Sequence, residues 1–208
     1  MNKLFLFFIL IPAYVFGQHT KLLPPPNHPP TKAENLLADK EYQCFHSSKF
    51  SKEKRRSFSP FSTADTIKLI SFKSPEPGDT SDIYTPIAPN HFILNKNKVI
   101  EIKTLSQNGI DSLTNILYNI GRTPVKNVRF TIEDHGSCYD PRNAILFIND
   151  KGVVTQYIEV CFECERYYLS SKSTKSFPTC AQKYQLLKNY FLAQGLKYGT
   201  VLPKRDQE

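Results

Sequence analysis

The chain of 208 residues contains no tryptophan and, beyond its first residues, no long apolar run. The missing tryptophan does not exclude a packed core, because 15 phenylalanines and 11 tyrosines can fill one. Hydrophobic residues make up 40% and charged residues 22%, which is typical of a globular domain. No later segment reaches the roughly 20 apolar residues that a membrane-spanning helix needs. We therefore expect one folded domain with a tail.

Residues 1–17 have the layout of a secretory signal peptide. Lys3 precedes an apolar run of 13 residues, Leu4 to Phe16, and the small residue Gly17 stands before polar Gln18. We predict cleavage near Gly17 and a secreted or periplasmic protein. An uncleaved N-terminal anchor is the alternative, although the run is shorter than a bilayer requires. No cysteine stands directly after the predicted cleavage site, so a lipoprotein anchor is not expected.

Catalytic motifs are also missing. The chain has no G-x-S-x-G, no H-E-x-x-H and no P-loop, and this favours a role other than catalysis. One polar loop, "DHGSCYDPRN", holds His135, Asp140 and Arg142, with Glu159 on the neighbouring predicted strand. These four residues could form a hydrolytic site from an acid, a base and an anion clamp. The structural alternative, which we favour, is that Arg142 pairs with Glu159 across two strands.

Residues 18–63 are predicted to be a largely flexible tether. "LLPPPNHPP" favours extended polyproline conformation, although Thr31 and Glu34 match a helix capping box. A basic run follows, in a chain whose formal charge is +8. It could attract an anionic surface, but we favour a solvated segment, because no aromatic stacking pattern surrounds it. Its cations are Lys49, Lys52, Lys54, Arg55 and Arg56.

A single domain is predicted for residues 64–203. Alternating apolar residues indicate strands over 66–72 and 125–134, and hairpins over 91–105 and 144–162. Apolar residues at spacings of three and four predict a helix over 110–120, with Asn108 as its N-cap. A second helix is predicted from Thr179 to Gly195, with a capping box at Gln182. The expected fold class is α+β, a two-layer sandwich of a mostly antiparallel sheet and two amphipathic helices.

The hairpin over 144–162 allows the cysteines to be placed. Asn149 and Gly152 match a type I turn. If Asn149 pairs with Val153, the numbers of opposed residues sum to 302 and Cys138 lies across from Cys164. In a turn one residue tighter, Cys138 lies across from Glu163. Either register brings Cys138 towards the end of the strand that carries the C-x-x-C sequence.

Five cysteines remain after the predicted cleavage, in a compartment where disulfides persist. Because five is odd, full pairing within the chain is impossible. A cluster of Cys138, Cys161, Cys164 and Cys180 is expected, either as disulfides or as a structural zinc site. Cys138–Cys164 is the easiest pair, and Cys180 could bond Cys161 or Cys164. Cys44 is predicted to lie outside the domain, either free or bonded to an unpaired cysteine or another chain.

A thiol redox site at Cys161, Cys164 and Cys180 is the third alternative. A reactive C-x-x-C thiol needs a helix N-terminus or a nearby cation to lower its pKa. Here the pair follows a strand, so this alternative is disfavoured. The leading hypothesis is therefore a secreted or periplasmic binding or structural domain of unknown ligand, stapled by the cysteine cluster.

The segment "CYDPRNAILFINDKGVVTQYIEVCFEC" is followed by Cys180-x-x-Lys183 and by "GLKYG". Over Leu113 to Gly199, the chain resembles uncharacterised secreted proteins of Gram-negative bacteria that share this pattern. The resemblance implies that Cys161, Cys164 and Cys180 act together and that Pro141-Arg142 belongs to the same framework. It implies no activity.

Overall fold

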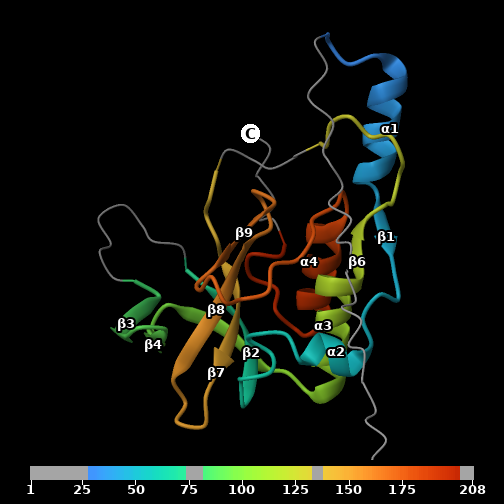
Figure 1. The fold of residues 1–208 in the computed structure, drawn as a ribbon. Helices are drawn as coiled ribbons and strands as arrows, with labels where there is room; N and C mark the ends of the chain where they lie inside the picture. Colours follow the sequence, from blue (N-terminus) through green and yellow to red (C-terminus); the bar gives the residue numbers. More distant parts are fainter. Residues whose placement is uncertain (1–27, 74–81, 133–137, 202–208) are drawn as a thin grey trace, which may run out of the picture.

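The computed structural model describes residues 28–73, 82–132 and 138–201. In these residues, four helices accompany two antiparallel sheets, which confirms the predicted α+β class. Figure 1 shows α3 and α4 on one side of the large sheet, and β3 and β4 at its far edge. None of the helices in the described ranges is long and apolar enough to cross a membrane.

The large sheet has seven strands in the order β3-β4-β8-β7-β2-β5, and β9 pairs with β8 off this path. All the pairings are antiparallel. The strands are β2 (Thr66–Phe72), β3 (Tyr84–Ala88), β4 (His91–Leu94), β5 (Val99–Thr104), β7 (Asn143–Ile148), β8 (Val154–Cys161) and β9 (Arg166–Leu169).

The hairpin of β7 and β8 forms as predicted at its turn. The Asn149 N–H donates to the Val153 carbonyl at 3.0 Å, and Gly152 has a φ of +76°. Ile148 pairs with Val154, in the predicted register, but Phe147 pairs with Gln156. The extra residue in β8 is a bulge, which shifts every later pair by one position. Glu159 therefore lies opposite Ala144, in neither of the two predicted registers.

The predicted hairpin of β4 and β5 is wrong. β4 pairs with β3 and β8, whereas β5 pairs with β2 at the other end of the sheet. The connection between them is short and contains a turn, in which the Lys98 N–H donates to the Asn95 carbonyl at 3.1 Å. Four strand spacings on a flat sheet would be about 19 Å. The sheet must therefore curl so that β4 and β5 approach each other, and its inner face becomes concave.

α3 (Gln107–Asn119) and α4 (Lys183–Ala193) cover the outer face of the sheet. The Ser106 hydroxyl, and not Asn108, caps α3 by accepting from the Gly109 N–H at 3.2 Å. α4 begins at Lys183 without a side-chain cap, so the predicted capping box at Thr179 is wrong. Gly195, with a φ of +96°, stands just beyond the end of α4, as predicted.

Two apolar clusters lie on opposite faces of the sheet. The outer cluster joins strand residues to α3 and α4, and the inner cluster lies within the curl. Alternation explains the division, because neighbouring residues of a strand point to opposite faces. The outer cluster includes Ile67, Leu69, Leu113, Leu117, Ile145, Phe147, Ile158, Val160, Leu187 and Phe191. The inner cluster comprises Ile70, Phe72, Tyr84, Ala144, Leu146, Ile148 and Val154.

The segment predicted as a tether contains regular structure from residue 32 onwards. It carries α1 (Lys32–Tyr42), β1 (Cys44–His46) and α2 (Lys52–Arg56), and β1 pairs with β6 (Ile120–Arg122). Its partners are more than fifty positions away in the chain, so local sequence gives no sign of them. The predicted capping box of Thr31 and Glu34 is confirmed.

Two further predictions depend on where the described residues end. No strand forms over residues 125–132, so the predicted strand over 125–134 is wrong for that part, and its last two residues lie outside the described ranges. The predicted signal peptide, residues 1–17, lies entirely outside the described residues.

Candidate functional site

A cavity of about 700 Å³ opens on the inner face of the curled sheet. Its walls come from β2, β3, β4, β8 and the segment that precedes β7. This volume lies within the range of about 300–1,000 Å³ that is usual for small-molecule sites. The lining residues are Phe72, Lys73, Asp82, Ile83, Tyr84, Pro86, Phe92, Lys98, Tyr139, Asp140, Pro141, Tyr157 and Glu159.

Aromatic rings form one wall of the cavity. Tyr84 of β3 stacks on Tyr157 of β8, with ring centroids 3.7 Å apart and planes 14° from parallel. Phe92 meets the Tyr157 ring edge to face at 5.2 Å, and Phe72 meets Tyr84 in the same way at 6.4 Å. Edge-to-face and stacked pairs of this kind hold ring orientations more firmly than apolar area alone. The wall is therefore preformed.

Glu159 adds a carboxylate to the lining of this aromatic cavity. It follows Tyr157 by two residues on β8, so both side chains point to the inner face. Its Oε2 accepts a hydrogen bond from the Tyr139 hydroxyl at 2.8 Å. Burial raises the pKa of Glu159, and the Tyr139 bond offsets only part of that shift. Among the described residues, the Glu159 carboxylate thus has one hydrogen-bond donor, the Tyr139 hydroxyl, and no cationic partner.

Tyr84 lines the same cavity as this acid, and its hydroxyl has no hydrogen-bond partner among the described residues. Tyr84 is 6% exposed. Burial raises its pKa strongly, and the negative charge of Glu159 raises it further. A buried hydroxyl without a partner costs about 1–3 kcal/mol. Such a group at a cavity wall can bond to a ligand atom.

Two lysines, Lys73 and Lys98, line the opposite side of the cavity. They flank β2 and β5, and their backbones are joined by a hydrogen bond from the Lys73 N–H to the Lys98 carbonyl at 2.9 Å. β2 is two strands away from β8, about 10 Å across the sheet. The backbone of Lys73 therefore lies about two strand spacings from that of Glu159.

The predicted polar residues are brought only partly together. Asp140 and Glu159 both line the cavity. Arg142 forms ion pairs with Asp140 at 3.0 Å and with Glu163 at 3.1 Å, so the structure gives it partners other than Glu159. The register explains this: the turn excludes the tighter pairing that would oppose Arg142 and Glu159, and the bulge shifts Glu159 one position further, opposite Ala144. His135 lies outside the described residues.

Next to the cavity, Cys138 and Cys164 form a disulfide with Cα atoms 5.6 Å apart, as predicted. Cys161 is a buried free thiol. It donates to the Asp140 carbonyl at 3.3 Å, and its sulfur accepts from the Cys164 N–H at the same distance. The two cysteines of the C-x-x-C sequence are therefore not bonded to each other, and Cys161 does not compete for Cys180.

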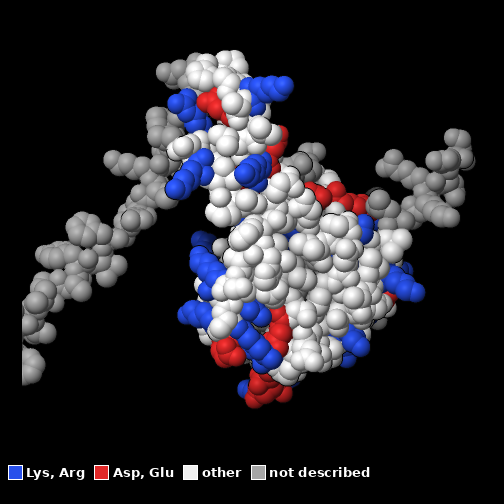
Figure 2. Space-filling view, turned by 90° about the vertical axis from the view of Figure 1, so that its right-hand side faces the viewer, with Lys and Arg blue, Asp and Glu red and all other residues white. Residues whose placement is uncertain are grey.

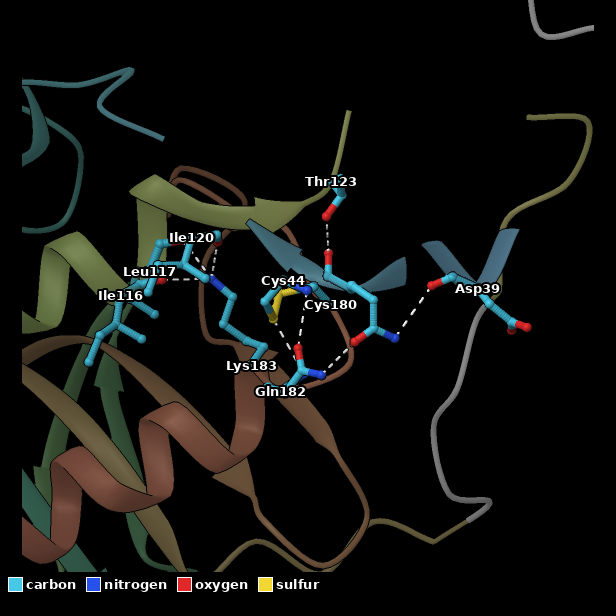
Figure 3. The surroundings of a disulfide bond; sticks show 10 residues. Asp39, Cys44, Ile116, Leu117, Ile120, Thr123, Cys180, Gln182 and Lys183 are labelled. Carbon is cyan, nitrogen blue, oxygen red and sulfur yellow. Dashed lines mark hydrogen bonds between the residues drawn. A yellow bond between two sulfur atoms is a disulfide. The ribbon is translucent and has the colours of Figure 1, made fainter. Parts of the chain in front are cut away.

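Cys180 bonds instead to Cys44, with Cα atoms 5.1 Å apart (Figure 3). Gln182 supports this disulfide, because its side-chain oxygen accepts from the Cys44 N–H at 3.1 Å. Cys44 thus belongs to the folded unit, which corrects the prediction that it lies outside the domain. The zinc alternative is also corrected, because three of its four proposed sulfurs are in disulfides. The described residues hold no group of three or more metal-ligating side chains.

Lys183, three residues after Cys180, is fully buried at the end of α3. Its ammonium donates to the carbonyl oxygens of Ile116 at 2.6 Å, Leu117 at 3.2 Å and Ile120 (Figure 3). Burial lowers the pKa of Lys183 to about 7. A cation at a helix C-terminus satisfies carbonyls that have no partner within the helix. This lysine therefore has a structural role in joining α4 to α3.

The basic run is largely engaged inside the fold. Asp111 of α3 forms ion pairs with Lys52 at 2.5 Å and with Arg56 at 2.7 Å. Arg55 is buried and donates to the Thr114 hydroxyl and the Phe50 carbonyl. Figure 2 shows the side on which α1, β1 and β6 lie, where basic side chains gather at the margins. Three of the five cations named in the sequence thus stabilise the contact of α2 with α3.

Sequence reasoning found Glu159 and Asp140 but missed the aromatic residues of the cavity. For Tyr157 a signal existed, because it shares a strand face with Glu159 in the predicted hairpin. For Tyr84 no signal existed, since β3 was not predicted as a strand.

The fold and this cavity define a class of protein: an α+β domain with a curled antiparallel sheet, two disulfides and an open inner core. A comparison with protein-family models, with curated proteins and with solved structures gives no match to this chain. No activity therefore comes to it by similarity, and the resemblance to secreted bacterial proteins stays a prediction.

Proposed function

We propose that this protein is a secreted or periplasmic binding domain that takes a small amine-bearing ligand into the cavity at Glu159. One observation carries the proposal. The Glu159 carboxylate, which has no cationic partner among the described residues, and the Tyr84 hydroxyl, which has no hydrogen-bond partner among them, line the same aromatic cavity.

The chemistry of these groups favours an ammonium over other ligand groups. An ammonium has three N–H donors and no acceptor. The Glu159 carboxylate and the Tyr84 and Tyr139 oxygens are all able to accept. Aromatic ring faces also attract cations, by about 0.5–2 kcal/mol. An apolar or aromatic body attached to the amine would lie against Tyr157 and Phe92.

The disulfides and the N-terminal sequence support the proposed secreted or periplasmic location. Two disulfides join four of the five cysteines, and such bonds persist in oxidising compartments. The predicted signal peptide would deliver the chain there. Cys138–Cys164 holds the segment that carries Tyr139 and Asp140 at the cavity, whereas Cys44–Cys180 ties the N-terminal segment to the start of α4.

The test uses benzylamine as the probe and benzyl alcohol as its neutral counterpart, with calorimetry on the chain that begins at Gln18. We expect benzylamine to bind and benzyl alcohol to bind at least tenfold more weakly. Glu159→Gln should weaken benzylamine binding by about tenfold to a hundredfold, because a hydrogen bond to a charged group contributes about 1.5–3 kcal/mol. Asp150→Asn, at the far end of the same hairpin, is the matched control.

Tyr84→Phe separates binding from folding. It removes the unpartnered hydroxyl, so the free protein should be no less stable than the wild type, while affinity for benzylamine falls. Equal affinities for benzylamine and benzyl alcohol, or an effect of Asp150→Asn as large as that of Glu159→Gln, would contradict the proposal.

A further inference from the structure

A second hollow, of about 560 Å³, opens on the concave side of the sheet between β4 and β5. It shares only Phe92 with the Glu159 cavity. Its lining holds no acidic side chain, and its only charged members are Lys68 and Lys96. The remaining lining residues are Phe92, Ile93, Leu94, Val99, Ile100, Ile102, Ile148, Gly152, Val153 and Val154.

Three of the four isoleucines of this groove are exposed. Ile93 is 55% exposed, Ile100 42% and Ile102 53%. Apolar side chains that gather in one exposed patch mark a binding surface more often than isolated ones do. The floor of the groove is formed by Ile148 and Val154 of the inner cluster. An apolar ligand in the groove would therefore extend a core that is already packed.

The two lysines add a charge requirement. Lys68 is half buried and projects from β2 on the inner face, and Lys96 lies in the turn between β4 and β5. The ammonium group of neither lysine forms a hydrogen bond or an ion pair with another described residue. An ammonium beside apolar surface is stabilised by an anion that brings its own apolar body.

We propose that this groove binds a single-chain anionic amphiphile, a fatty-acid carboxylate in chemical class. Its alkyl chain lies along Leu94, Ile100 and Ile102, and its carboxylate meets the ammonium group of Lys68 or of Lys96. A second copy of this chain fits less well, because a two-fold contact through the groove would bring four lysines into one interface, and the groove has no acidic side chain to pair with them.

The length of the chain gives the first test, again on the chain that begins at Gln18. We expect dodecanoate, at concentrations below micelle formation, to bind in calorimetry. Shortening the tail to octanoate should weaken binding by about fourfold for each CH₂ removed from the groove. Dodecyltrimethylammonium has the same tail with a cationic head and should bind at least tenfold more weakly.

Substitutions in and outside the groove test whether dodecanoate binds there. Ile102→Ser should lower dodecanoate affinity by about tenfold or more, and Ile87→Ser is the matched control. Ile87 is 52% exposed on β3 but does not line the groove. Lys68→Gln with Lys96→Gln should weaken dodecanoate binding and improve dodecyltrimethylammonium binding. Lys103→Gln, an exposed lysine of β5 outside the groove, should change neither.

Three results would overturn this inference. One is equal binding of the carboxylate and the ammonium amphiphile. Another is binding to anionic phospholipid vesicles with none to monomeric dodecanoate, which would indicate a membrane surface. The third is concentration-dependent dimerisation that Ile102→Ser abolishes, which would make the groove an interface between copies.

Discussion

The two faces of the large sheet are built from the same strands but are completed in different ways. The outer face is covered by α3 and α4, and its cluster includes fully buried residues such as Leu117 and Phe191. The inner face has no helix over it in the described residues, and only the curl of the sheet encloses it. Both open hollows described above lie on this inner face. Stability is thus concentrated on one face, and ligand-sized space on the other.

The two disulfides give the largest test of this difference. Cys44–Cys180 closes a separation of 136 residues and Cys138–Cys164 one of 26. From loop entropy, replacing both cysteines of the first pair by serine should cost about 5 kcal/mol, and the same change in the second about 3.5 kcal/mol. Urea unfolding of both variants measures this. Equal losses would show that the first disulfide does not hold the N-terminal segment on the domain.

Truncating a side chain should also lower the free energy of unfolding much more on the outer face than on the inner face. Leu117→Ala removes buried methyl groups between α3 and the sheet and should cost about 2–5 kcal/mol. Ile102→Ala, on the groove of the inner face, should cost less than about 1 kcal/mol, because the isoleucine is already half exposed. Urea unfolding of the two variants measures this difference. Similar losses for Leu117→Ala and Ile102→Ala would mean that the inner face is closed in solution.

A buried cation on the outer side should make stability rise with pH. The native pKa of Lys183 is lowered to about 7, whereas an unfolded lysine titrates near 10.4. Between these values the unfolded chain binds more protons, so the free energy of unfolding should rise by up to about 1.4 kcal/mol per pH unit. Lys183→Met should lack this slope between about pH 7 and 9. An identical pH dependence in both proteins would mean that Lys183 stays charged in the fold.

The buried acid of the inner side should act in the opposite sense and more weakly. Burial raises the native pKa of Glu159 above its unfolded value, near 4.3. Between the unfolded pKa and the raised native pKa, the native state binds more protons than the unfolded chain. The free energy of unfolding therefore falls as pH rises through this range. Glu159→Gln should therefore be more stable than the wild type at pH 7, and the difference should vanish below about pH 4. A constant difference at every pH would exclude ionisation as its cause.

The elements that were predicted correctly depend on residues that lie close together in the sequence. The strand over 66–72, the turn at Asn149 and Gly152, and a second helix that ends before Gly195 all appear in the structure. The Cys138–Cys164 disulfide was also within reach, because it depends on one hairpin. β5 could not be placed, since its pairing with β2 depends on the curl of the whole sheet.

The sequence by itself determined the fold class, the odd number of cysteines and the acid at Glu159, because alternation, counting and turn chemistry are properties of neighbouring residues. Only the tertiary structure decided that Cys44 reaches Cys180, that Asp111 engages the basic run, and that Tyr84 stacks on Tyr157 beside Glu159. Each of these contacts joins positions more than fifty residues apart. Their geometry depends on how the sheet curls and where the helices pack, and no local pattern carries that information.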